Sequence, residues 1–138
     1  MDKLAVLKQY FGHDAFRPGQ ETLVDAALSG RDVLGIMPTG GGKSLCYQVP
    51  AMLLPGVTLV ISPLISLMKD QVAALRSAGV PAAFLNSSQD REGARQVWGA
   101  VRRDRVRLLY VAPERQGDAR CLELVASRGI RMVAVDEA

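Results

Sequence analysis

A glycine-rich stretch, Met37-Pro38-Thr39-Gly40-Gly41-Gly42-Lys43-Ser44, carries the residue types of a phosphate-binding loop. Successive glycines allow backbone conformations closed to other residues, so several amide groups can converge on one anion. Lys43 would bring a mobile positive charge to the terminal phosphates, and the Ser44 hydroxyl is placed to ligate magnesium. The stretch therefore predicts a nucleoside triphosphate site formed by Thr39, Gly40, Gly41, Gly42, Lys43 and Ser44.

This loop departs from the usual pattern at its first position. The pattern is glycine, four residues, then Gly-Lys-Ser/Thr, and position 37 holds methionine instead of that first glycine. The plain alternative is a glycine-rich turn with a solvated lysine. An apolar run before the loop and a helix-forming stretch after it favour phosphate binding, because a helix N-terminus adds its positive dipole end at that point.

Two acidic residues, Asp136 and Glu137, follow an apolar run near the end of the chain. A strand that ends in acidic residues can bring Asp136 beside the magnesium, usually through coordinated water. Glu137 is then positioned to orient or deprotonate the attacking water. Two acidic residues capping a strand would be the simpler interpretation in isolation. Together with Lys43 and Ser44, they predict binding of ATP or GTP with Mg²⁺.

Three polar residues near the N-terminus could contact a nucleobase. Gln20 has an amide that can donate to and accept from the edge of an adenine. Arg17 and His13 are flat enough to stack on a base. Each has a plainer alternative, namely an exposed helix glutamine, a surface arginine and a loop histidine.

Short apolar runs alternate with helical stretches, which predicts β-α-β units and a parallel sheet, an α/β fold. Strands are expected at 31–36, 57–61, 82–85, 108–112 and 131–135. Helices are expected at 3–11, 63–76, 89–101 and 119–127. Two further helices are expected, one that ends at residue 28 and one that begins at residue 44. Ligands of such sheets bind at the carboxyl ends of strands.

Local patterns refine these helices. The first helix is apolar at Leu4, Leu7 and Phe11, and Gly12 should end it. The second helix should run through Leu28, with Pro18 in its first turn and Gly30 as its terminator. In the helix over 63–76 we expect an apolar face formed by Leu64, Met68, Val72 and Leu75, and a solvated face formed by Ser66, Lys69, Asp70 and Gln71.

Composition narrows the class of protein. The 138 residues are 49% hydrophobic and 22% charged, which fits a soluble globular domain. A net charge of +3 permits an anionic partner without establishing one. The charge run over 102–107 is interpreted as a solvated connection rather than a binding patch. We expect no membrane span and no secretory signal, a cytoplasmic location, and Cys46 and Cys121 as small apolar fillers.

Five motifs resemble the RecQ family of DNA helicases, in the order of that family and over nearly the whole chain. They are Phe16-Arg17-Pro18-Gly19-Gln20, the stretch from Met37 to Gln48, the stretch from Ile61 to Gln71, Tyr110-Val111-Ala112-Pro113-Glu114-Arg115 and Val135-Asp136-Glu137-Ala138. Met37 also agrees with this family. The resemblance implies a RecA-like P-loop NTPase fold, with helices and the adenine motif in 1–30 and an incomplete first helicase lobe over 31–138.

The resemblance also implies an enzyme that uses ATP to move 3′ to 5′ along single-stranded DNA and separate duplexes, in DNA repair and recombination. Arg17 and Gln20 would recognise adenine, and His13 would stack on it, at a position where this family more often has an aromatic residue. Gly40, Gly42, Lys43 and Ser44 would hold the phosphates and magnesium, Asp136 the magnesium, and Glu137 would be the catalytic base. The DNA contacts implied are Ser62, Pro63, Leu64, Lys69, Gln71, Pro113, Glu114 and Arg115.

In this family a second lobe supplies an arginine to the ATP site, so the 138 residues alone are expected not to unwind DNA. Nucleoid association in a bacterial cytoplasm would follow from a DNA substrate. Two other interpretations stay open: a nucleotide-binding module that works without catalysis, and a related translocase that acts on RNA.

Overall fold

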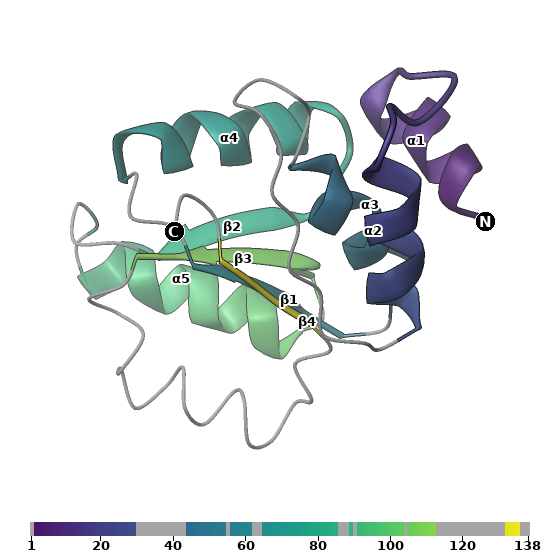
Figure 1. Cartoon of the computed structure of the whole chain (residues 1–138). Coiled ribbons are helices and arrows are strands. Elements are labelled where there is room, and N and C mark those ends of the chain that lie inside the picture. Colours follow the sequence, from purple (N-terminus) through teal and green to yellow (C-terminus); the bar gives the residue numbers. More distant parts are fainter. Residues whose placement is uncertain are drawn as a thin grey trace. The chain divides into compact units, whose positions relative to one another are not determined.

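The computed structural model describes residues 2–29, 44–54, 56–61, 65–85, 89, 91–103, 105–112 and 132–135 (Figure 1). The chain divides into two compact units, Met1–Pro55 and Gly56–Ala138, and each is described by itself. The predicted strand at 31–36, the glycine-rich loop up to Lys43 and the helix at 119–127 lie outside the described residues. The predicted division into 1–30 and 31–138 stays a prediction.

The first unit contains three helices, α1 (Lys3–Phe11), α2 (Gln20–Leu28) and α3 (Leu45–Leu53). The Asp2 carboxylate caps α1 by accepting from the Ala5 N–H at 2.8 Å. Gly12 ends α1 as predicted, with a φ of 71° that favours glycine. Lys3 links α1 to α2, because its Nζ lies 2.6 Å from Asp25 Oδ1, and this hydrogen bond raises the pKa of Lys3.

The apolar positions of α1 differ in burial, and one local prediction for this unit, the place of Pro18, is wrong. The core is formed by Val6, Leu7, Val24 and Val49, whereas Leu4 is 38% exposed. The buried face of α1 is centred on Val6 and Leu7, so Leu4 falls at its edge. Pro18 precedes α2 instead of sitting in its first turn, because Gly19 occupies the N-cap position. The helix ends at Leu28, as predicted.

The second unit contains a sheet of β1 (Thr58–Ile61), β2 (Ala82–Leu85), β3 (Leu108–Val111) and β4 (Met132–Val135). The strand order is β2-β3-β1-β4, and every neighbouring pair is parallel. The α/β fold with a parallel sheet is thus confirmed. The last residues of the four strands are register partners, so the strands end along one line: Leu85, Val111, Ile61 and Val135.

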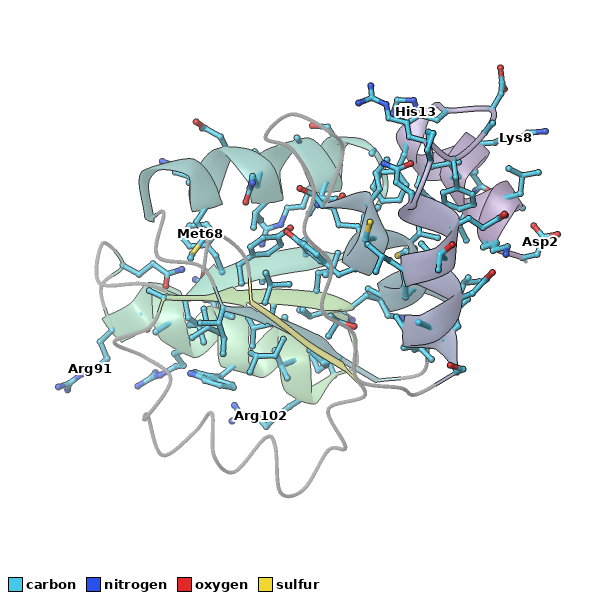
Figure 2. All side chains as sticks on the ribbon, in the orientation of Figure 1. Asp2, Lys8, His13, Met68, Arg91 and Arg102 are labelled. Atoms are coloured by element: carbon cyan, nitrogen blue, oxygen red, sulfur yellow. The ribbon has the colours of Figure 1, made fainter. Side chains whose placement is uncertain are left out.

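Helices cover both faces of this sheet (Figure 1). On one face, α5 (Arg91–Arg102) packs Ala94, Trp98 and Val101 into a cluster with strand residues such as Leu59 and Leu109. On the other face lies α4 (Ile65–Ser77), and Figure 2 shows Met68 directed from α4 toward the sheet. All four residues of β3 are buried, as expected of a strand covered on both sides.

The predicted faces of α4 are largely confirmed. Met68, Val72 and Leu75 are buried, while Lys69 and Asp70 are exposed and Gln71 is half-buried. Leu64 lies outside the described residues, and nothing is described of the Ser66 side chain.

The predicted start of the next helix at Gln89 is wrong, because α5 begins at Arg91. Gln89 Nε2 instead donates to the Phe84 carbonyl at 2.8 Å, which ties this residue back to β2.

Candidate nucleotide-binding site

Gln20 forms a closed turn with Arg17 at the start of α2. The Gln20 Oε1 accepts from the Arg17 N–H at 2.7 Å, and the Gln20 N–H donates to the Arg17 carbonyl at 3.0 Å. Gly19 permits this turn through its φ of 87°. Only 1% of Gln20 is exposed, so the alternative of an exposed helix glutamine is wrong. An amide held this firmly loses little further freedom when it meets a ligand.

Arg17 and His13 are exposed on the connection between α1 and α2. The His13 N–H donates to the Leu7 carbonyl at 3.4 Å, so the backbone of His13 is held at the end of α1 (Figure 2). The structure therefore places all three predicted base-contacting residues in the helical unit. Their contact with adenine stays a prediction.

Ser44 is the N-cap residue of α3 and comes directly after Lys43 in the sequence. Its carbonyl accepts from the Gln48 N–H at 3.0 Å, but its side chain makes no capping hydrogen bond. The half-buried hydroxyl is thus not used to cap the helix, and oxygen is the ligand that Mg²⁺ prefers. Thr39, Gly40, Gly41, Gly42 and Lys43 lie outside the described residues. Since α2 packs on α3, the structure brings Gln20 and Ser44 into one packed unit.

The remaining predicted site residues come, in the sequence, after the carboxyl ends of the strands. Ser62 comes next after β1, and Asp136 comes next after β4. Ile61 and Val135 are register partners on neighbouring strands, which are about 5 Å apart in parallel sheets. The predicted residues beyond these strand ends lie outside the described residues: Ser62, Pro63, Leu64, Pro113, Glu114, Arg115, Asp136 and Glu137.

Cys46 lies in the first turn of α3 as a half-buried thiol. Burial raises the pKa of this thiol, because loss of water disfavours the thiolate. Cys121 lies outside the described residues.

We expect Cys46, measured in a Cys121→Ser background, to react with iodoacetamide more slowly at pH 7.5 than in urea. Only the thiolate is alkylated, so the rate should climb with pH to values above those at which an ordinary thiol levels off. Equal rates with and without urea would contradict a buried thiol.

Sequence reasoning missed two side chains that hold the sheet to its connections. Arg76 Nε donates to the Ala82 carbonyl at 2.8 Å, and Gln89 binds the Phe84 carbonyl as described above. Both bonds join a polar side chain to a backbone group whose position depends on tertiary structure, so no periodicity in the sequence points to them. Within the described ranges, no three His, Cys, Asp or Glu residues gather as a metal site, and no helix is long and apolar enough to cross a membrane.

Residues 17–138 match the family model described as DEAD/DEAH box helicase. The chain belongs to the DEAD/DEAH box helicase family. The matched range begins at Arg17, so it includes the turn at Gln20 and leaves His13 outside. The parallel sheet with a helix on either face agrees with part of a RecA-like helicase lobe, as the sequence predicted.

Relatives of this DEAD/DEAH box helicase chain carry the name ATP-dependent DNA helicase RecQ. The Haemophilus influenzae protein is 50% identical over 135 residues, which cover 98% of this chain and 22% of the relative. The Pasteurella multocida protein is 50% identical over 98% of this chain and 21% of its own length. The Bacillus subtilis protein is 42% identical over 97% of this chain and 23% of its own length. The predicted resemblance to RecQ helicases is confirmed, and the chain spans about a fifth of these relatives.

Proposed function

We propose that this chain is part of an ATP-dependent DNA helicase of the RecQ type. The whole protein would couple ATP hydrolysis to 3′ to 5′ movement on single-stranded DNA and to duplex separation, in DNA repair and recombination at the bacterial nucleoid. The observation that carries this proposal is the common line on which four parallel strands end. The acidic pair and both predicted DNA motifs come directly after strands that end on this line. Residues that follow the carboxyl ends of parallel strands can form one ligand site, so nucleotide and DNA could be bound next to each other.

The nucleotide site divides into binding and catalytic roles. Lys43 and the backbone amides of residues 40–42 would hold the phosphates, and Gln20 with Arg17 would select adenine. Ser44 and Asp136 would hold Mg²⁺, which neutralises phosphate charge when bound. Glu137 would accept a proton from the attacking water. A second lobe of the whole protein would supply an arginine for the transferred phosphoryl group.

DNA contacts would come from the residues that follow β1 and β3 and from α4. Lys69, exposed on α4, carries a charge suited to a phosphate, and Gln71 can donate from its amide. Phosphates and sugars carry no base information, so binding through these residues would be largely independent of sequence.

The proposal is tested by measuring ATP hydrolysis of the full-length protein with single-stranded DNA, with RNA of the same sequence and with neither. We expect turnover that rises with DNA, and strand separation of duplexes with a 3′ overhang but not a 5′ overhang. ATP binding without turnover would favour the nucleotide-binding module instead. Stronger stimulation by RNA would favour the RNA translocase.

Substitution Gln20→Ala should abolish the preference for ATP over GTP while leaving turnover at saturating nucleotide largely intact. Loss of the hydrogen bonds between the glutamine amide and the edge of the base should raise the KM for ATP roughly tenfold. The measurement is kcat/KM for both nucleotides in the full-length protein. Gln96→Ala, on the exposed side of α5, is the control and should change neither value. An unchanged ATP preference in Gln20→Ala would exclude this glutamine from base recognition.

A further inference from the structure

Positive charge gathers in one short part of the second unit. Residues 102–107 contain four arginines and one aspartate, a formal charge of +3 that equals the net charge of the whole chain. The rest of the sequence is therefore neutral overall. This concentration makes the run the densest stretch of charge in the sequence, and its net positive charge attracts anions.

The backbone of this run is held in place by the fold. The Arg103 and Arg105 N–H groups donate to the Ala100 carbonyl at 3.2 and 3.0 Å, and the Arg107 N–H donates to the Pro81 carbonyl at 2.8 Å. The side chains of Arg103 and Arg105 are nevertheless exposed. The exposed side chains agree with the solvated connection that the sequence predicts, and these hydrogen bonds show in addition that its backbone is held in place. The charged side chains are therefore carried on an ordered backbone, so little backbone freedom remains to be lost when a ligand binds.

Helix α5 extends the charged surface. Arg91, Arg95 and Arg102 are exposed, and their spacing of four and seven residues places them along one side of the helix. Figure 2 shows Arg91 and Arg102 at the two ends of α5. They are separated by about 16 Å along the axis at 1.5 Å per residue, which corresponds to about five nucleotides of one strand at 3.4 Å each. We call Arg91, Arg95, Arg102, Arg103 and Arg105 the arginine surface.

Helix stability does not account for this arrangement. Arg102 is favourable near the helix C-terminus, but Arg91 occupies the first turn, where the helix dipole disfavours a cation. Arg95 has Glu92 as a neighbour at 3.8 Å, and both side chains are largely exposed, so this ion pair contributes little. The positions of Arg91 and Arg95 are thus not explained by the helix dipole or by this ion pair.

Arg103 and Arg105 precede the amino end of β3, away from the predicted DNA motifs, while Arg91 comes six residues after the carboxyl end of β2. Residues 105–107 lead into Leu108, the first residue of β3, at the amino end of the strand. The motifs at 62–64 and 113–115 follow the carboxyl ends of β1 and β3. A strand of four residues spans about 13 Å, so residues 105–107 and the two motifs join the sheet at opposite ends of its strands.

We propose that the arginine surface binds the sugar–phosphate backbone of a nucleic-acid strand, outside the path used by the motor. Guanidinium groups remain charged and bind phosphate oxygens in pairs, so a row of them suits a repeating phosphate ligand better than a single anion. This surface would hold a second segment of the substrate that the proposed helicase acts on, and in that respect it rests on the proposed function.

The test uses the full-length protein with Arg91→Gln, Arg95→Gln, Arg103→Gln and Arg105→Gln combined. Fluorescence anisotropy of a labelled 25-nucleotide DNA strand, without nucleotide, is measured from 50 to 300 mM NaCl. We expect at least tenfold weaker binding at 100 mM. The slope of log affinity against log salt should shrink by about 3, since each lost contact to a single strand removes about 0.7.

Matched single substitutions provide the control for charge alone. Arg103→Gln and Lys8→Gln each remove one positive charge from an exposed side chain, and Lys8 lies on α1 in the other unit. Arg103→Gln should weaken DNA binding measurably, while Lys8→Gln should not. If melting curves show that the combined variant is unfolded, the DNA affinities of these two single variants test the proposal instead.

Each outcome separates this proposal from the proposed function. DNA-stimulated ATP turnover should keep its kcat at saturating DNA, with a higher DNA concentration for half-maximal rate. Unchanged affinity and salt slope would overturn the arginine surface and leave the helicase proposal intact, as would competition by polyglutamate equal to that by DNA. A fall in kcat at saturating DNA would place these arginines within the motor and also overturn it. No stimulation by DNA in the unmodified protein would instead contradict the proposed function.

Discussion

Replacing Glu137 with glutamine should lower the kcat for ATP hydrolysis by about 10²–10⁴ while leaving ATP binding close to its original strength. Removal of a positioned general base produces losses of this size. Glutamine keeps the size and polarity of the side chain but cannot accept the proton, so phosphate binding should persist. Phosphate release is measured in the full-length protein at saturating single-stranded DNA, alongside the affinity for a fluorescent ATP analogue.

Lys43→Ala distinguishes catalysis from binding at the same site. Loss of this lysine removes a charge that contacts the phosphates before and during the reaction, so both affinity and turnover should fall, the latter by about 10²–10³. The two variants should therefore differ in binding and agree in their loss of turnover. A kcat within fivefold of the unmodified protein in Glu137→Gln would remove this residue from the role of base.

Trp98→Ala should destabilise the second unit by about 3–5 kcal/mol. Trp98 is 5% exposed and lies in the cluster between α5 and the sheet, so truncation leaves a large cavity beneath the helix. Such a loss approaches the whole stability of many domains. Amide hydrogen exchange of the full-length protein should show at least 100-fold less protection in α5 and β2, because local opening becomes easier. Protection in α1, α2 and α3 should stay the same.

Two controls assign this effect to packing. Trp98→Phe keeps most of the apolar volume and should lose less protection than Trp98→Ala. Gln96→Ala changes an exposed residue of the same helix and should leave the exchange rates alone. Equal protection in Trp98→Ala and the unmodified protein would mean that α5 is not held by this cluster.

Periodicity predicted the elements of the sheet unit well. The run at 82–85 has the bounds of β2, and Met68, Val72 and Leu75 face inward at helical spacing. Period and burial are linked directly in a helix covered on one side, so such patterns are informative. The same reasoning marks Leu4 as an apolar position of α1 without predicting its exposure, because periodicity cannot locate the centre of an apolar face in a helix of nine residues.

The candidate site shows a different limit. Ser44 is singled out by its place in the glycine-rich loop, and Gln20 by its amide together with the resemblance to a known family. The bond from the Arg17 N–H to Gln20 Oε1 depends on the positive φ of Gly19, which the sequence permits but does not require. The shared register of the strand ends arises from pairing between distant segments, which no local pattern encodes.

The strand order has a consequence for synthesis of the chain. Thr58 pairs with Leu108 and with Met132, so β1 finds its first neighbour only fifty residues later and its second another twenty-four residues after that. At about 5–20 residues per second, the nascent β1 waits several seconds for β3. During that interval an apolar strand edge is open to other chains. Conditions that slow translation between residues 61 and 108 should therefore favour aggregation or recruitment of chaperones.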